Sequence, residues 1–439
     1  MDHIKNKFKL TTLTPTAILN GEVIDSFEYS NYGNYIYRLD LDKILNHLIK
    51  EITNSIEKIS DWVDNIEEII NQNENAARHT SSLRIFDFIQ RYLKKPEITQ
   101  WLEHEIKENR FIKYKIPSNL DQNSSRQIAI HIKTANNQVY IPGSTLKGLI
   151  RTTLLNEYLY NVFDSKDANK IKKLTDDINF HLNQSNNSID QFAQSVISDF
   201  FKFRSGKYDA KNDIMKFIRV CDTNAINVSD ACEVVHPEIF TRNGKKQQGQ
   251  LNPLEVIKSG VTFEFTIDFD IDFLRNTIKN IEIKDKKYLE ESLKLFNISS
   301  IEVMKNEISQ VITTIYQTIE DSLFNYSIFV SEKNDSFIQS NKKIKGLKIG
   351  ENDIIAQIGW GTGFHTKTIL FNFLNLYWKD DETFKEIYKT IFQKYRIRRN
   401  TRKNNQNVEI NLDTFPTSRR TLKINNQYQQ LGWVKIERL

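Results

Sequence analysis

The sequence predicts an α+β fold in which short strands and helices follow one another at irregular spacing. Apolar and polar residues alternate over 261–269, as in a half-buried strand, whereas apolar residues recur every three or four positions from Leu41 to about Ile106, as in helices. The long insertions argue against a doubly wound nucleotide-binding fold. With 439 residues, the chain can form two or three ordinary domains, or one domain with large insertions.

The N-terminal elements follow from local patterns. Alternation predicts strands at residues 8–13, 35–39, 111–116, 127–132 and 138–141. A helical insertion is expected near residues 41–108. Pro142-Gly143 ends the last of these strands, and Ser144 is a suitable N-cap for a helix that runs to about Tyr160.

The C-terminal elements are less evenly spaced. We expect a polar stretch, a helix and a strand at residues 164–190, 192–203 and 215–221. Two polar loops are expected at 236–253, which should project from the body, and at 331–350. The remaining predictions are a helical segment at 285–327, a buried strand at 354–358 and a helix at 367–378. We divide the chain into an N-terminal part, 1–235, and a C-terminal part, 236–439.

Composition excludes several classes of protein. Cys221 and Cys232 are too few for a disulfide framework or a thiolate zinc site, and we expect both to be buried thiols of an intracellular protein. No segment approaches the roughly 20 apolar residues that span a bilayer, and the N-terminus lacks an apolar run. We therefore expect a cytoplasmic protein without a membrane partner.

The distribution of charge is more informative than the net charge of +5. Residues 392–423 hold two acidic residues against nine basic ones: Lys394, Arg396, Arg398, Arg399, Arg402, Lys403, Arg419, Arg420 and Lys423. Asn, Gln and Thr interrupt these basic residues, which suits contact with phosphates. A solvated loop is an equally good interpretation of the charge alone.

A glycine-rich segment, IGWGTGFHTKT at 358–368, follows the last strand. Gly359, Gly361 and Gly363 permit positive φ angles and close approach of a ligand to the backbone. Lys367 beside the start of the following helix would favour phosphate. Base-stacking faces could come from Trp360, Phe364 and His365.

This segment matches neither familiar nucleotide-binding loop. The Walker A loop requires glycine immediately before its lysine, and the dinucleotide fingerprint requires a third glycine, but Thr366 stands at both positions. A turn that begins a helix, with buried aromatic residues, stays an open alternative to a ligand-binding loop.

A second segment, YIPGSTLKGLIR at 140–151, has a similar order of strand, turn and helix. Lys147 and Arg151 are four residues apart and should share one face near the helix N-terminus, where anions are favoured. They are candidate contacts to the phosphates of RNA, although a surface pair on an amphipathic helix would show the same spacing.

Six runs of sequence carry a family resemblance. In chain order, from Leu10 to Ile436, they are LTTLTPTAILNGEV, IPGSTLKGLIRTTLL, FIRVCDTNAI, LEVIKSGVTFEFTI, IGWGTGFHTKTI and LGWVKI. Together they resemble the RAMP superfamily of CRISPR-associated proteins. The last two narrow the resemblance to the fifth-subunit family of the type III-A Csm interference complexes.

The resemblance implies a ferredoxin-like (RNA-recognition-motif-like) core with large helical insertions and a glycine-rich loop on the RNA path. It implies an antiviral subunit at the end of the complex that holds the 3′ part of the guide RNA and helps to mature it. The implied partners are guide RNA, with target RNA as a further candidate, the neighbouring backbone RAMP subunit, the small helical subunit and recruited host nucleases. In this family the first turn usually holds a histidine followed by Gly-x-Gly. Here that turn contains Ala17, Ile18 and Asn20, and Gly21 is its only glycine, which leaves RNA contact at this turn open.

The sequence predicts no catalytic activity, metal or cofactor. The eight histidines are scattered, and none of the motifs HExxH, paired aspartate or HD is present. His365 lacks a visible partner, so stacking or hydrogen bonding to RNA is favoured over acid–base catalysis. Two alternatives stay open: a metal-independent CRISPR RNA endonuclease of the same superfamily, which is usually much shorter, and a protein–protein cap with little RNA affinity.

Overall fold

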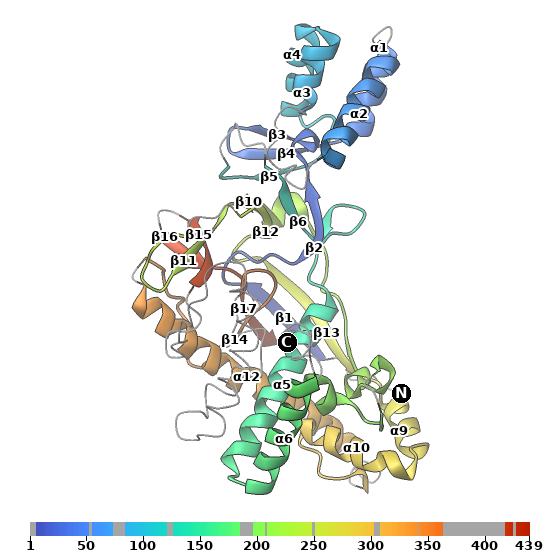
Figure 1. The fold of residues 1–439 in the computed structure, drawn as a ribbon, viewed down its shortest axis with the longest axis vertical. Helices are drawn as coiled ribbons and strands as arrows, with labels where there is room; N and C mark the ends of the chain where they lie inside the picture. Colours follow the sequence, from blue (N-terminus) through green and yellow to red (C-terminus); the bar gives the residue numbers. More distant parts are fainter. Residues whose placement is uncertain are drawn as a thin grey trace.

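The computed structural model describes residues 6–51, 55–72, 84–120, 126–184, 196–206, 209–247, 251–302, 308–341, 343–362, 418–424 and 427–439. A five-stranded antiparallel sheet lies at its centre, in the order β14-β17-β1-β13-β8 (Figure 1). These strands are Ile354–Gln357 (β14), Trp433–Arg438 (β17), Asn6–Thr12 (β1), Thr262–Phe269 (β13) and Ile218–Val220 (β8). The first and last strands of the described chain are therefore neighbours.

Two long helices cover this sheet. α5 (Gly143–Asp164) and α12 (Ile308–Ser340) contact each other, and their buried apolar residues recur every three to five positions. These residues join the main hydrophobic core and include Leu146, Ile150 and Leu154 from α5 and Ile315, Ile319 and Leu323 from α12. A hydrogen bond of 3.1 Å between the Thr153 and Ser322 hydroxyls joins the two helices inside this core.

Smaller sheets surround the central one. A four-stranded sheet has the order β10-β12-β6-β2, with bounds Cys232–Val235, Leu254–Ile257, Ile128–His131 and Leu19–Ile24. A three-stranded sheet has the order β11-β15-β16, with bounds Pro237–Thr241, Ser418–Ile424 and Gln427–Gln430. A short pair joins β7 (Gln138–Val139) to β9 (Ile226–Asn227).

A helical lobe stands at one end of the molecule, above a second three-stranded sheet (Figure 1). That sheet contains β3 (Tyr29–Tyr32), β4 (Tyr35–Leu39) and β5 (Ile112–Pro117). The lobe contains α1 (Leu41–Glu51), α2 (Ser55–Gln72), α3 (Ile85–Phe88), the π-helical η4 (Ile89–Leu93) and α4 (Pro96–Lys107). It has a hydrophobic core of its own, in which Trp62 stacks on Phe88 with ring centroids 4.8 Å apart.

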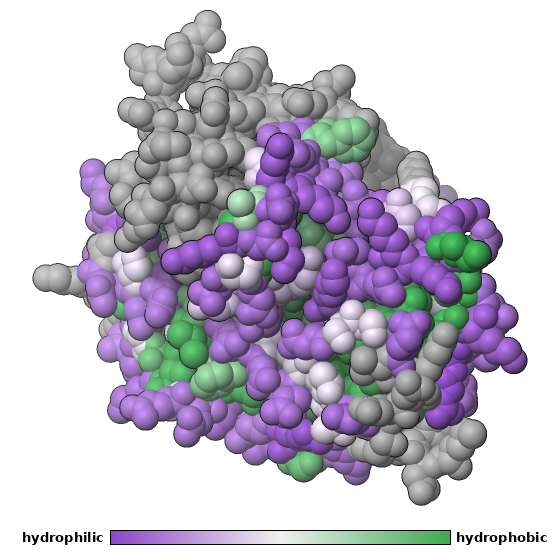
Figure 2. Space-filling view, turned by 90° about the horizontal axis from the view of Figure 1, so that it is seen from below, coloured by the Kyte–Doolittle hydropathy of each residue, from purple (hydrophilic) through white to green (hydrophobic). Residues whose placement is uncertain are grey.

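Helices also occupy the opposite end. They include α6 (Ala168–Gln184), α9 (Ile271–Lys279), α10 (Ile283–Leu293) and the 3-10 turn η7 (Lys294–Phe296). Seen from this end, the described surface is mostly hydrophilic, with apolar side chains in separate groups (Figure 2). The remaining short elements are η1 (Ser26–Glu28), η5 (Ala210–Asn212), η6 (Ile214–Phe217) and α8 (Val228–Ala231). Among the described helices, none is long and apolar enough to span a bilayer.

The structure confirms the mixed α and β content and most predicted strands. The strands at 8–13, 35–39, 111–116, 127–132, 261–269 and 354–358 are β1, β4, β5, β6, β13 and β14, with ends that differ by at most two residues. The helical insertion falls where its spacing indicated, at α1–α4. The helix predicted at 367–378 lies outside the described residues.

Three other predictions were wrong. The loop at 331–350 is helical to Ser340, because Val330 and Phe337 are buried and hold the last turns of α12 in place. The strand at 215–221 begins as the 3-10 turn η6, whose Met215 amide donates to the Asp213 carboxylate at 2.8 Å. The loop at 236–253 begins with β11, which pairs with β15 and buries Phe240.

Two predictions about single residues also need correction. Cys221 is exposed, whereas Cys232 is buried as expected. Ser144 is not an N-cap, because α5 already begins at Gly143.

Candidate nucleic-acid interface

The glycine-rich segment leaves the central sheet at the end of β14. Gly359 and Gly361 have φ angles of +83° and +81°, a region that side chains with a Cβ rarely adopt. A Cβ on Gly359 would lie 2.2 Å from the carbonyl oxygen of Ala17, and the Trp360 amide donates to that same oxygen at 2.7 Å. The approach of the neighbouring backbone is therefore sufficient by itself to require glycine at 359.

The other side of this segment contacts the C-terminal LGW run. The Ile358 amide donates to the Gly432 carbonyl at 2.8 Å, and a Cβ on Gly432 would lie 2.3 Å from the Ile358 oxygen. The Gly432 amide in turn donates to the Pro15 carbonyl at 2.9 Å. Three segments that are distant in sequence thus fix the path of the chain through Trp360.

Trp360 and Arg420 form a stacked pair beside this backbone. The guanidinium carbon of Arg420 lies 4.4 Å from the centroid of the Trp360 ring, and Arg420 is exposed. Trp360 is half-buried against a small apolar cluster that includes Ala17 and Leu431. Partial burial lowers the pKa of Arg420 below its ordinary value, but the group stays cationic at neutral pH. The pair offers an aromatic surface and a positive charge side by side.

Arg419 points to the opposite side of β15 from Arg420. Only 6% of its surface is exposed, and its guanidinium donates to the Thr362 carbonyl at 3.2 Å. Burial lowers its pKa to about 10. The two adjacent arginines, predicted together as RNA contacts, therefore occupy different environments.

The segment at 140–151 makes internal contacts at both of its ends. A Cβ on Gly143 would lie 2.2 Å from the Val220 oxygen, and the Gly143 amide donates to the Asp222 carboxylate at 2.7 Å. Arg151 forms an ion pair with Asp213. The Asp222 carboxylate therefore already occupies the start of α5, where the helix favours an anion.

The basic residues of α5 are only partly available. Arg151 also stacks on Phe201, with its guanidinium carbon 3.9 Å from the ring centroid. Lys147 is half-buried, and this burial lowers its pKa below the ordinary value. Their assignment as RNA contacts stays a prediction. Gly363, His365, Lys367, Arg398 and Arg399 lie outside the described residues, so their assignment also stays a prediction.

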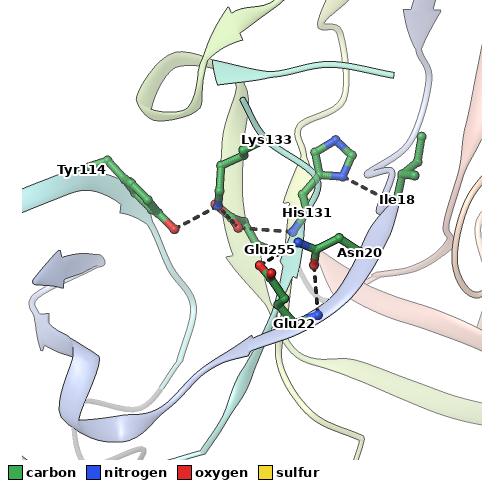
Figure 3. Close-up of polar contacts among 7 residues, drawn as sticks. All are labelled: Ile18, Asn20, Glu22, Tyr114, His131, Lys133 and Glu255. Carbon is green, nitrogen blue, oxygen red and sulfur yellow. Dashed lines mark hydrogen bonds and ion pairs between the residues drawn. The ribbon is translucent and has the colours of Figure 1, made fainter. Parts of the chain in front are cut away.

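Sequence reasoning missed a buried polar cluster behind the first turn (Figure 3). Lys133 forms an ion pair with Glu255, which is fully buried, and donates to the Tyr114 hydroxyl at 2.9 Å. His131 is also fully buried, and its Nδ1 accepts from the Ile18 amide at 2.9 Å. The signal in the sequence was the single charge in the otherwise apolar strand Leu254–Ile257.

This cluster and the glycine-rich segment hold the first turn from two sides. His131 binds the Ile18 amide, while Trp360 binds the Ala17 carbonyl. Beyond them, Asn20 and Glu22 are exposed and hydrogen-bond to each other at 2.7 Å (Figure 3). The Glu22 carboxylate would repel a phosphate here, which disfavours RNA contact at this turn.

The described residues contain no group of three or more His, Cys, Asp and Glu residues that could hold a metal ion. Burial lowers the pKa of His131 to about 3, so this histidine is neutral at physiological pH and enclosed by protein. His131 is therefore suited to holding the backbone of the first turn in place, through its hydrogen bond with the Ile18 amide.

Comparisons with known proteins agree with this architecture. A sequence model of the RAMP superfamily matches residues 9–412. The CRISPR protein Csm5 of Methanocaldococcus jannaschii is 22% identical over 437 residues, which cover 99% of this chain and 89% of the relative.

Two solved structures share the fold. One is a chain of a type III-A Csm–crRNA–target RNA ternary complex solved by cryo-EM, with a TM-score of 0.59, 19% identity and coverage of 98% of this chain and 100% of that one. The other is the crystal structure of Csm5 from T. onnurineus, with a TM-score of 0.56, 16% identity and coverage of 97% and 99%. Since the superfamily model spans almost the whole length, from β1 to beyond Thr362, this chain belongs to the RAMP superfamily.

Proposed function

We propose that this protein is a non-catalytic, RNA-binding subunit of a type III-A CRISPR effector complex, at the end that holds the 3′ part of the guide RNA. Similarity to Csm5 along nearly the whole of both chains supports the choice of complex and subunit. The observation that carries RNA binding is the Trp360–Arg420 pair, presented beside a backbone that three segments hold in place.

The pair suits a single-stranded segment of RNA. A base can stack on the exposed part of the indole, which contributes about 1–3 kcal/mol per base, while the guanidinium contacts the adjacent phosphate. Neither contact reads a base edge, so binding should be independent of sequence. A guide-binding subunit needs this property because the guide sequence varies.

Filter binding of the purified protein to labelled guide RNA, at several salt concentrations, tests this proposal. Trp360→Ala should weaken binding roughly 5- to 150-fold, since one stacked base is lost. Arg420→Gln should weaken binding and reduce the slope of log K against log salt by about one unit. Arg420→Lys should keep the slope while losing part of the affinity, because lysine retains the charge but not the planar group.

A matched control is Arg275→Gln, which removes an exposed arginine on α9, at the end of the molecule opposite the helical lobe and away from β15 (Figure 1). It should leave both affinity and slope unchanged. Wild-type affinity in Trp360→Ala and Arg420→Gln would refute the interface. Negligible RNA affinity in the wild type would favour a protein–protein cap.

We propose that the chain leaves RNA intact. Incubation with repeat-containing RNA in EDTA should give no cleavage products. Cleavage that His365→Ala abolishes would instead support the metal-independent endonuclease.

We further propose the partners that the family resemblance implies: guide and target RNA, the neighbouring backbone RAMP subunit, the small helical subunit and host nucleases. Co-purification with tagged complex subunits tests the protein partners, and sequencing the 3′ ends of the bound RNA tests a role in guide maturation. Retention of unshortened 3′ ends when this protein is deleted is the expected result.

We also propose that the five-stranded sheet with α5 and α12 is a ferredoxin-like RAMP core. The division into 1–235 and 236–439 stays a prediction, and the central sheet takes strands from both parts.

A further inference from the structure

Two arginines from different segments stack on one phenylalanine. The guanidinium carbon of Arg242, in the turn after β11, lies 5.5 Å from the ring centroid of Phe337, and that of Arg419, on β15, lies 5.6 Å from it. Phe337 comes from the last turns of α12, which lie against the β11-β15-β16 sheet (Figure 1). A shared ring therefore brings two cations together.

Within the described part of the chain, neither guanidinium has a carboxylate within ion-pair distance. The Nε atoms of Arg242 and Arg419 are both buried and lack a hydrogen-bond partner. The bond from Arg419 to the Thr362 carbonyl uses one of five N–H donors. Arg419 is thus a nearly fully buried cation whose Nε donor is unused.

This arrangement is unfavourable without a counter-charge. Burial lowers the pKa of Arg419, and the positive charge of Arg242 lowers it further, which shows that the two cations repel each other. The pKa of Arg242 is also lowered, and burial is the cause. Stacking on Phe337 recovers only part of this loss, because a cation–π contact is weaker than the desolvation penalty of a buried ion.

The surrounding surface is basic. Exposed lysines follow the turn after β11, the segment after α12 and the end of β15: Lys245, Lys343, Lys345 and Lys423. Lys345 and Lys423 are neighbours through the backbone, since the Lys345 amide donates to the Tyr428 carbonyl at 2.8 Å and Lys423 pairs with Tyr428. The nearby carboxylate of Glu238 forms an ion pair with Lys246 at 2.8 Å.

We propose that Arg242 and Arg419 form a binding site for a phosphate group, and that a phosphodiester of the bound RNA occupies it. Guanidinium groups bind phosphate well, and the two non-bridging oxygens of a phosphodiester can each accept from one of the two arginines. The exposed lysines around the two arginines favour a polyanion over an isolated ion. The choice of RNA as the source rests on the proposed function, whereas the phosphate site does not.

Inorganic phosphate is the first probe. The thermal unfolding midpoint of the full-length protein should rise with phosphate concentration, relative to chloride at equal ionic strength. Arg242→Gln should abolish this rise, while Arg275→Gln should retain it. Arg242 is only half-buried, so its replacement leaves the fold intact even if Arg419→Gln does not fold.

RNA is the second probe. Arg242→Gln should weaken guide RNA binding roughly tenfold and reduce the salt slope by about one unit. The same phosphate-induced rise in wild type and Arg242→Gln, or no rise in either, would overturn the site.

A phosphate response without any change in RNA binding would retain the site and reject RNA as its source. Loss of RNA binding in Trp360→Ala, with an unchanged phosphate response, would show that the two sites are independent. RNA binding unaffected by Trp360→Ala or Arg420→Gln, together with an intact phosphate response, would reject only the proposed interface.

Discussion

Replacing Gly359 with alanine should destabilise the protein by about 2–5 kcal/mol. Its φ of +83° costs an L-residue roughly 1–2 kcal/mol. In addition, the new Cβ would lie 2.2 Å from the Ala17 oxygen, and separating two backbone segments costs roughly 1–3 kcal/mol. The Trp360 hydrogen bond to Ala17 would lengthen as the segments separate.

Gly21 is the matched control for this change. Its φ is +94°, but a Cβ there would meet nothing within 4 Å. Gly21→Ala therefore pays the conformational cost alone, and the difference between the two variants isolates the contact with Ala17.

Urea unfolding followed by tryptophan fluorescence, with midpoint and m-value fitted together, measures both variants. Gly359→Ala should be the less stable by about 1–3 kcal/mol. Equal losses within about 0.5 kcal/mol would mean that the glycine is present for its φ angle alone, and the interpretation of a tightly packed junction would fail.

Three further predictions concern buried contacts. Burial lowers the pKa of His131 to about 3, below roughly 6.5 in the unfolded chain, so its contribution to stability is complete above pH 6.5 and is lost as the pH falls toward 3. Lowering the pH from 7.5 to 5 should therefore reduce the free energy of unfolding by about 2 kcal/mol, measured by urea titration. His131→Asn should reduce this pH dependence. Asp222→Ala removes the carboxylate that accepts from Gly143 at the start of α5, and should lower the unfolding free energy by about 1–2 kcal/mol, whereas a loss below about 0.3 kcal/mol would contradict the capping role. Asp213→Asn removes the charge from the ion pair with Arg151 and should cost about 2–3 kcal/mol, and an unchanged thermal midpoint would show that this ion pair does not contribute to stability.

Sequence reasoning located the elements well where burial follows a simple period. The alternation at 261–269 became β13, whose even-numbered side chains are more exposed than the buried Phe263, Phe265, Ile267 and Phe269. It failed in the second half of α12, where Ser, Asn, Glu and Lys between Phe329 and Phe337 hid the helical spacing of the buried residues.

The sequence indicated the unusual backbone of the candidate site but not the contacts that its residues make. Glycines at 359 and 361 indicated unusual backbone, yet only the fold shows that Ala17 approaches Gly359. Adjacent arginines looked equivalent in sequence, and the alternation along β15 separates exposed Arg420 from buried Arg419. His131 gave no signal, because its role depends on a hydrogen bond across the sheet to Ile18.

The position of β17 inside the central sheet has a consequence for folding during synthesis. β1 is synthesised long before its partner β17, and Arg438 hydrogen-bonds to Asn6 across 432 residues. Until Trp433–Arg438 is made, one edge of β1 and one edge of β14 lack their partner and can pair with other chains. A chain that stops before β17 should therefore aggregate, even though it retains the helical lobe and most of the main core.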